Sequence, residues 1–128
     1  MGQNPNKGDY SIFLVDDDNF HRSLYKRILN TFGYQVIATA KNGMEAIEKY
    51  KNFSKYPNLV IMDYNMPGKT GIDAGNVIKK INKQAKILIM SSDTEIKEEV
   101  ILNGMSFIDK ASSIKNLLEE LQKIEDST

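Results

Sequence analysis

Five short apolar runs alternate along this chain with five longer segments whose apolar residues recur at helical spacing. This alternation constrains the fold strongly, because strands joined through helices form a mainly parallel sheet with right-handed crossovers and helices on both faces. At least three runs are nearly continuous, as expected of strands covered on both sides. The sequence therefore predicts an α/β fold with a doubly wound, five-stranded parallel sheet. The predicted strands are 11–15, 35–38, 59–62, 86–90 and 106–108.

Each helical segment offers one apolar stripe, a pattern typical of a helix that packs on one side. Gly33 suits the end of the first helix, Asn42-Gly43 a turn before the second, and Ser112-Ser113 a cap for the last. The stripes are Phe20, Leu24, Ile28 and Phe32; Met44, Ile47 and Tyr50; Ala74, Val77, Ile78 and Ile81; Ile96, Val100 and Ile101; and Ile114, Leu117, Leu118, Leu121 and Ile124.

The length of 128 residues leaves room for one hydrophobic core. We expect a flexible N-terminal tail over residues 1–9, which are polar and contain Pro and Gly, and a single domain over residues 10–126. No apolar run reaches the ~18 residues of a membrane span. The beginning of the chain also lacks the apolar segment of a secretory signal, so we expect a cytoplasmic protein without a membrane partner.

The composition removes several classes of function. The 17 Lys and Arg residues balance 17 Asp and Glu residues, so the chain lacks the positive field that marks a protein binding nucleic acid or anionic membranes. The absence of cysteine excludes disulfides, thiolate zinc sites and a catalytic thiol, and the single histidine excludes a histidine-rich metal site. Oxygen ligands are what remain for a metal.

Acidic residues directly follow two of the predicted strands. The first strand runs into Asp16-Asp17-Asp18 and the third into Asp63. If these strands are neighbours, the acids converge beyond the carboxyl ends of the strands, where ligands bind in such sheets. Asp18 suits the N-cap of the next helix, whereas three further carboxylates repel one another unless a cation lies among them. Mg²⁺ prefers such oxygen donors, so we predict a magnesium site.

A hydroxyl and an ammonium group join the same edge of the predicted sheet. The fourth strand ends at Ser91-Ser92, and Lys110 follows the fifth within two residues. Before any phosphate binds, the positive charges of Mg²⁺ and Lys110 balance the negative charges of Asp16, Asp17 and Asp63. Such a group of residues can stabilise the in-line transfer of a phosphoryl group onto a carboxylate.

Four motifs occur in order at the ends of predicted strands, and together they resemble the signature of the CheY-like response regulator receiver domains of two-component signalling. The resemblance covers residues 10 to 125 and implies a flavodoxin-like sheet with strand order 2-1-3-4-5. The motifs are Val15-Asp16-Asp17, Met62-Asp63-Tyr64-Asn65-Met66-Pro67-Gly68, Met90-Ser91-Ser92, and Gly104 through Phe107-Ile108-Asp109-Lys110.

The resemblance implies a phosphoacceptor and a set of metal ligands. Asp63 is expected to accept a phosphoryl group from a sensor histidine kinase, a phosphotransfer protein or a small phosphodonor. Asp17, Asp63 and the backbone carbonyl of Asn65 are expected to bind Mg²⁺, and Asp16 is expected to act mainly through a metal-bound water. A domain of this kind catalyses its own phosphorylation and dephosphorylation.

The resemblance also implies a conformational switch. Lys110 is expected to pair with the phosphoryl oxygens, while Ser91 moves toward them and Phe107 turns inward into the space that Ser91 vacates. Such a two-state element is biased by local charge. The expected output is a changed surface on the fourth helix, fifth strand and fifth helix, read by a downstream protein target.

The sequence departs from the family pattern after Lys110. Ala111 follows it, where the family usually has proline after a cis peptide bond, and a cis bond before alanine costs roughly 3 kcal/mol more than a trans bond. Either the bond is trans and the loop differs, or tertiary contacts hold a strained cis bond. The stretch from Ser91 to Lys110 is also short for the family, which predicts an abbreviated fourth helix.

Three functions are compatible with these residues. The first is a stand-alone receiver switched by phosphorylation of Asp63. The second is a Mg²⁺-dependent phosphatase whose aspartyl nucleophile lies within Asp16-Asp17-Asp18, with a general acid two residues later. The third is a receiver that serves as a docking domain without phosphorylation.

Overall fold

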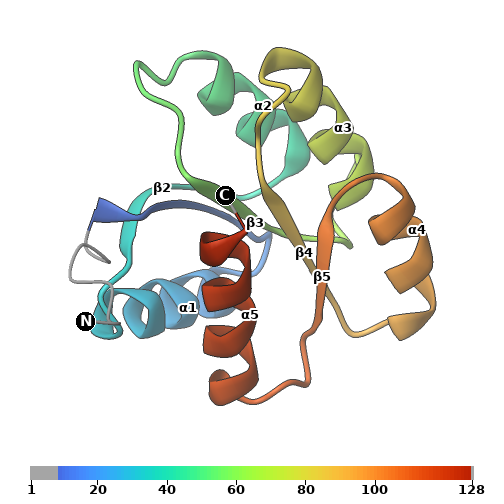
Figure 1. The fold of residues 1–128 in the computed structure, drawn as a ribbon. Helices are drawn as coiled ribbons and strands as arrows, with labels where there is room; N and C mark the ends of the chain where they lie inside the picture. Colours follow the sequence, from blue (N-terminus) through green and yellow to red (C-terminus); the bar gives the residue numbers. More distant parts are fainter. Residues whose placement is uncertain (1–8, 128) are drawn as a thin grey trace.

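The computed structural model describes residues 9–127. The expected tail over residues 1–9 thus lies outside the described residues except for Asp9. The described chain alternates strands and helices as the sequence predicts (Figure 1). The strands are β1 (Ser11–Val15), β2 (Gln35–Ala40), β3 (Leu59–Asp63), β4 (Ile87–Ser91) and β5 (Ser106–Asp109). The helices are α1 (Asn19–Thr31), α2 (Gly43–Lys51), α3 (Gly71–Ile81), α4 (Lys97–Leu102) and α5 (Ile114–Asp126), with a 3-10 turn at Thr94–Ile96 before α4.

The five strands form one parallel sheet in the order β2-β1-β3-β4-β5, which confirms the predicted fold and strand order. Strand β1 lies between β2 and β3, so the chain winds first to one side of β1 and then to the other. The strand order therefore reverses at the junction of β1 and β3, and this junction marks the edge where a ligand site is expected.

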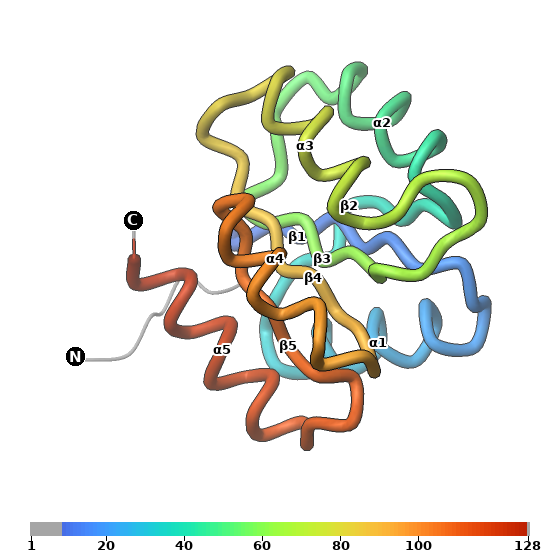
Figure 2. The backbone as a smooth tube through the Cα atoms, turned by 90° about the vertical axis from the view of Figure 1, so that its right-hand side faces the viewer, coloured from blue at the N-terminus to red at the C-terminus, as the bar shows by residue number. Residues whose placement is uncertain are grey.

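Helices cover both faces of the sheet and build a separate apolar cluster on each face (Figure 2). Phe13 and Val15 of β1 join the cluster under α2, α3 and α4, whereas Ile12 and Leu14 join the cluster under α1 and α5. This alternation follows from the two-residue period of a strand. Strands β3 and β4 are buried along their whole length, as their continuous apolar sequences predict.

The apolar stripe of α1 is largely exposed. Phe20 is 71% exposed and Phe32 47%, while Leu29 is fully buried against the sheet. The reason is geometric, because residues four apart advance by about 40° around an α-helix, so a stripe built only on that spacing turns away from one face. The buried side of α1 is centred near Leu29, which lies outside the predicted stripe.

Side-chain caps fix the start of the helices where the sequence predicts them. The Asp18 carboxylate accepts from the His21 N–H at 3.0 Å at the start of α1. Ser113 accepts from the Asn116 N–H at 3.1 Å at the start of α5. Helix α4 spans six residues, so it is abbreviated as expected. Within residues 9–127 no helix is long and apolar enough to cross a membrane.

Candidate functional site

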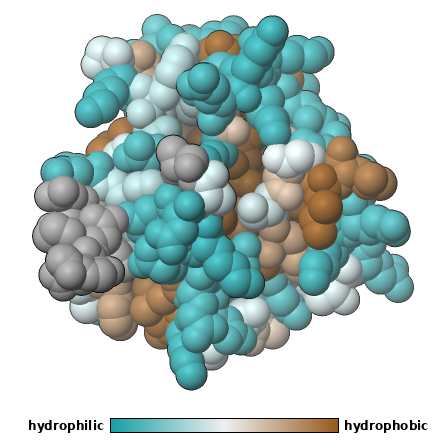
Figure 3. Space-filling model, viewed as in Figure 1, coloured by the Kyte–Doolittle hydropathy of each residue, from teal (hydrophilic) through white to brown (hydrophobic). Residues whose placement is uncertain are grey.

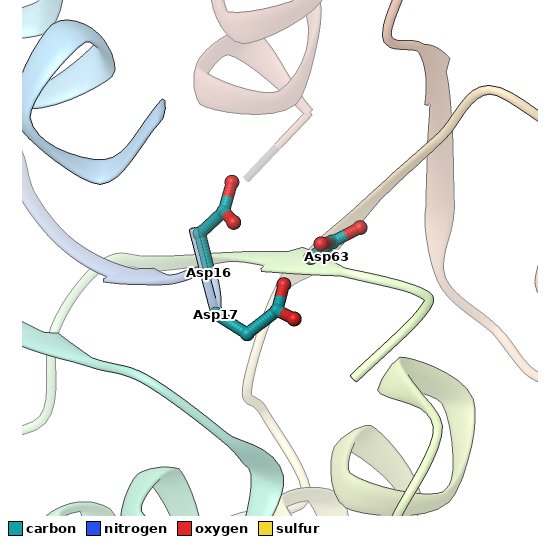
Figure 4. Close-up of side chains that lie close together, drawn as sticks. All are labelled: Asp16, Asp17 and Asp63. Carbon is teal, nitrogen blue, oxygen red and sulfur yellow. The ribbon is translucent and has the colours of Figure 1, made fainter. Parts of the chain in front are cut away.

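Three carboxylates meet at the carboxyl edge of the sheet, where β1 and β3 end side by side. The register pairs Val15 with Met62, so Asp16 and Asp63 follow at the same level. Carboxylate oxygens of Asp16, Asp17 and Asp63 all lie within 4.8 Å of one another. Figure 4 shows the three side chains grouped around the ends of these two strands. Asp16 and Asp63 are buried and Asp17 is exposed, so the cluster opens to solvent on the Asp17 side.

Lys110 reaches this cluster from the end of β5. Its backbone N–H donates to the Ser91 carbonyl at 2.9 Å, which continues the pairing of β4 and β5 by one residue. Its Nζ lies 3.2 Å from Asp63 Oδ2 and 3.9 Å from Asp16 Oδ2. The side chain is only 17% exposed, so the ammonium group faces the two buried carboxylates in a partly dehydrated setting.

Burial dominates the electrostatics of Asp63. Its removal from water raises the pKa of the carboxyl group to about 6, and the charge of Asp16 pushes the pKa in the same direction. The Lys110 ammonium group acts in the opposite sense and lowers that pKa. Asp63 is therefore mostly ionised at neutral pH, yet burial makes its charge costly, and a bound cation would offset that cost.

Hydrogen bonds hold the connection from β1 to α1 in place. The Asp16 carboxylate accepts from the Asp18 N–H at 2.9 Å, and the Asp16 carbonyl accepts from Arg22 Nη1 at 2.7 Å. Arg22 was not among the site residues predicted from the sequence. Its only signal was its position six residues after Asp16, near the start of the following helix.

The predicted switch residues occupy neighbouring strands. Ser91 is buried at the end of β4, and its Oγ accepts from the Asp93 N–H at 3.0 Å. Phe107 pairs with Ile89 across β4 and β5, and it is half-buried against the apolar cluster under α2, α3 and α4. Asn65 is exposed, two residues after the end of β3, in the connection to α3.

The bond between Lys110 and Ala111 is trans, because residues 9–127 contain no cis peptide bond. Of the two alternatives left open by the sequence, the structure has the trans bond and not the strained cis bond. The substitution of alanine for proline does not displace the lysine, whose Nζ still contacts Asp63.

The fold and the site together define an α/β domain in which a lysine and three clustered carboxylates lie at the topological switch point. The profile of the family described as "Response regulator receiver domain" matches residues 12–122, nearly the whole chain. The chain belongs to this family, as its four motifs had suggested.

Chemotaxis proteins named CheY are among the relatives of this chain. It is 35% identical to CheY of Treponema pallidum over 96% of this chain and 88% of the relative, and 38% identical to CheY of Bacillus subtilis over 89% and 96%. Its structure resembles CheY in the CheX–CheY–BeF3–Mg²⁺ complex of Borrelia burgdorferi, with a TM-score of 0.84 and 26% identity over 90% of this chain and 88% of that one. The chain therefore resembles small CheY proteins over most of their length.

Proposed function

We propose that this protein is a phosphorylation-dependent receiver in which Asp63 accepts the phosphoryl group. The observation that carries this proposal is the 3.2 Å contact between Lys110 Nζ and Asp63 Oδ2 beside two further carboxylates. A buried carboxylate next to a fixed ammonium group is suited to attack an electrophilic phosphorus atom, because the ammonium stabilises the charge of the transferred group. Membership of the receiver family supports the same assignment.

The three carboxylates fit a divalent cation. Their oxygens lie within 4.8 Å of one another, and hard oxygen donors are the ligands that Mg²⁺ prefers. Asp17, Asp63 and the Asn65 carbonyl are the proposed direct ligands, with Asp16 acting through water. When bound there, Mg²⁺ neutralises carboxylate charge and polarises the phosphoryl group. The related CheY of the Borrelia burgdorferi complex is named with Mg²⁺ and BeF3.

The proposed transfer forms one bond and breaks another. An Asp63 carboxylate oxygen bonds to phosphorus while the bond from phosphorus to the histidine nitrogen of the donor breaks. The imidazole leaves with the electron pair of that bond, and a proton on its other ring nitrogen keeps it neutral. Lys110 needs only a small movement to follow the transferred oxygens, since its Nζ already contacts Asp63. The chain thus catalyses its own phosphorylation.

Ser91 and Phe107 are the proposed switch. Ser91 Oγ accepts from the Asp93 N–H, so its hydroxyl hydrogen is free to point toward a new acceptor. A phosphoryl group on Asp63 adds three acceptor oxygens at this edge. We expect Ser91 to donate to one of them, and Phe107 to turn inward from its half-buried position.

The proposed partners are proteins that act before and after phosphorylation of Asp63. A sensor histidine kinase or a phosphotransfer protein supplies the phosphoryl group, and a downstream protein reads the changed surface of α4, β5 and α5. We place this exchange in the cytoplasm. The support for it is the membership of a signalling family and the relationship to chemotaxis proteins.

Intact-mass spectrometry after treatment with acetyl phosphate and Mg²⁺ tests the proposal. The wild-type chain is expected to gain one phosphoryl group, and Asp63→Asn none. Asp73→Asn, which changes an exposed carboxylate on α3, is the matched control and is expected to behave as wild type. Phosphorylation that is only weakened by Asp63→Asn points to a phosphatase nucleophile at Asp16, Asp17 or Asp18. A wild-type chain that gains nothing contradicts the proposal.

A further inference from the structure

The turn that carries Lys110 is closed twice by the residue before it. The Asp109 Oδ1 atom accepts from the Ala111 N–H at 2.8 Å, and the Asp109 carbonyl accepts from the Ser112 N–H at 2.9 Å. The first bond is an Asx turn and the second closes a four-residue β-turn. Lys110 is the second residue of that β-turn, so both bonds fix its backbone between Asp109 and Ser112.

The backbone on the other side of Lys110 is also fixed. Its own N–H donates to the Ser91 carbonyl at 2.9 Å. With the preceding and the following peptide units both held, the direction in which the Lys110 side chain leaves the backbone is restricted. That direction leads to Asp63 Oδ2, 3.2 Å from Nζ.

This turn depends on an N–H group at position 111. Alanine supplies it, whereas proline has no backbone N–H and would leave the Asp109 carboxylate without this donor. The aspartate and the alanine therefore work as a pair. The trans bond between Lys110 and Ala111 is compatible with the same turn.

We propose that Asp109 is a positioning residue for phosphoryl transfer, because its carboxylate oxygen holds the turn that aims Lys110 at Asp63. The inference rests on the proposed function, since it assigns to Asp109 an effect on the reaction that Lys110 assists. Asp109 does not contact Asp63 through any hydrogen bond or ion pair described within residues 9–127, so its effect passes through Lys110.

The rate of phosphorylation by acetyl phosphate, with saturating Mg²⁺ and followed by intact-mass spectrometry, tests this role. Asp109→Ala removes the acceptor and is expected to slow the reaction by between about tenfold and a hundredfold, the effect of a small misplacement of a catalytic group. Asp109→Asn keeps an oxygen acceptor at the same place and is expected to restore the rate to within about threefold of wild type.

Two further comparisons separate positioning from stability. Ser113→Ala removes the N-cap of α5 in the same connection and is expected to lower the melting temperature without slowing the reaction. In a Lys110→Ala background, Asp109→Ala is expected to cause no additional loss of rate, because the group that it positions is gone.

The outcomes distinguish this inference from the proposed function. A wild-type chain that is phosphorylated at the same rate as Asp109→Ala overturns the positioning role and leaves Asp63 as the acceptor. Failure of Asp109→Asn to restore the rate also overturns it, since charge and not the turn would then matter. If Asp109→Ala slows the reaction as much in the Lys110→Ala background as it does in the wild-type chain, the positioning role is overturned as well. A wild-type chain that is never phosphorylated refutes the proposed function and this inference with it.

Discussion

The interior of the sheet and its carboxyl edge obey different rules. Inside the strands, side chains such as Phe13 and Ile89 are fully buried and purely apolar. The buried polar and charged residues of the described chain are Asp16, Asp63 and Ser91, and all three lie at the carboxyl ends of strands. Interior burial stabilises the fold, whereas burial of carboxylates opposes it unless charges compensate. The buried carboxylates at this edge therefore lower the stability of the fold, and they are also the residues of the proposed reaction site.

Figure 3 shows that parts of the protein surface are apolar. Hydrophobic residues, in brown, gather over α4 and over α1 in this view. Leu102 of α4 is 79% exposed and Phe20 of α1 is 71% exposed. These apolar side chains belong to neither buried cluster, so their truncation is expected to leave the free energy of unfolding nearly unchanged.

The largest predicted effect is on the interior. Ile89→Ala on β4 leaves a cavity among fully buried neighbours, and we expect it to lower the free energy of unfolding by about 2 to 5 kcal/mol. Chemical denaturation measures this loss. Ile101→Ala, on the exposed side of α4, is the matched control and is expected to cost less than about 0.5 kcal/mol. Equal losses for the two variants would mean that β4 is not the centre of the core.

The next predicted effect is an increase in the free energy of unfolding, and it comes from a residue at the carboxyl edge of the sheet. The pKa of Asp63 is raised to about 6, so ionisation of this carboxyl group at pH 7 costs the metal-free native state about 3 kcal/mol relative to the unfolded chain. Asp63→Asn removes that cost, so we expect the variant to be more stable than wild type by about this amount at pH 7 in a chelating buffer.

The raised pKa of Asp63 also predicts how the stability of the native state changes with pH. A carboxyl group with a raised pKa stabilises the native state fully below its unfolded value, near 4, and loses that contribution as the pH rises through about 6. The stability difference between Asp63→Asn and wild type should therefore grow from pH 4 to pH 7. Glu98→Gln, an exposed change on α4, should show no such growth. A pH-independent difference would contradict the burial of the Asp63 charge.

The third effect concerns the counter-charge. Lys110→Met removes the ammonium group that lowers the pKa of Asp63, so we expect that pKa to rise further. A ¹³C-carboxyl NMR titration of the metal-free protein measures it. Lys97→Met, which changes an exposed lysine, should leave the titration of Asp63 as in wild type. An unchanged pKa in Lys110→Met would show that the lysine does not face Asp63 in solution.

The smallest effect is local and lies outside both regions. Thr70 caps α3 by accepting from the Asp73 N–H at 3.1 Å. Thr70→Ala is expected to lower the free energy of unfolding by about 1 kcal/mol, while Thr94→Ala, on an exposed threonine, should have little effect. Thermal denaturation distinguishes the two. A loss from Thr70→Ala as large as that from Ile89→Ala would contradict the expectation that the effect of this cap is small and local.

The strands could be predicted because their sequences follow the rule of the interior. A run such as Leu59-Val60-Ile61-Met62 is buried on both faces, and its continuous apolar character is readable without knowledge of its neighbours. The ends of these runs also located Asp63 and Ser91. The site was thus predictable as an edge, since parallel strands deliver their last residues to the same side.

The orientation of α1 and the turn at Lys110 were not predictable in the same way. The exposed stripe of α1 shares its composition with a buried one, and apolar composition alone does not show that Leu29, on another side of the helix, faces the sheet. Ala111 stands where the family usually has proline, and the sequence left the conformation of the following turn open. The bond from the Ala111 N–H to Asp109 depends on backbone geometry that residue spacing does not show.

The location of the phosphoryl group tests the central claim most directly. After treatment with acetyl phosphate and Mg²⁺, borohydride reduction converts an aspartyl phosphate into homoserine, which peptide mass mapping then places in the sequence. We predict homoserine at position 63 and unmodified aspartate at positions 16, 17 and 18. Homoserine at any of those three positions, with Asp63 intact, would contradict the account.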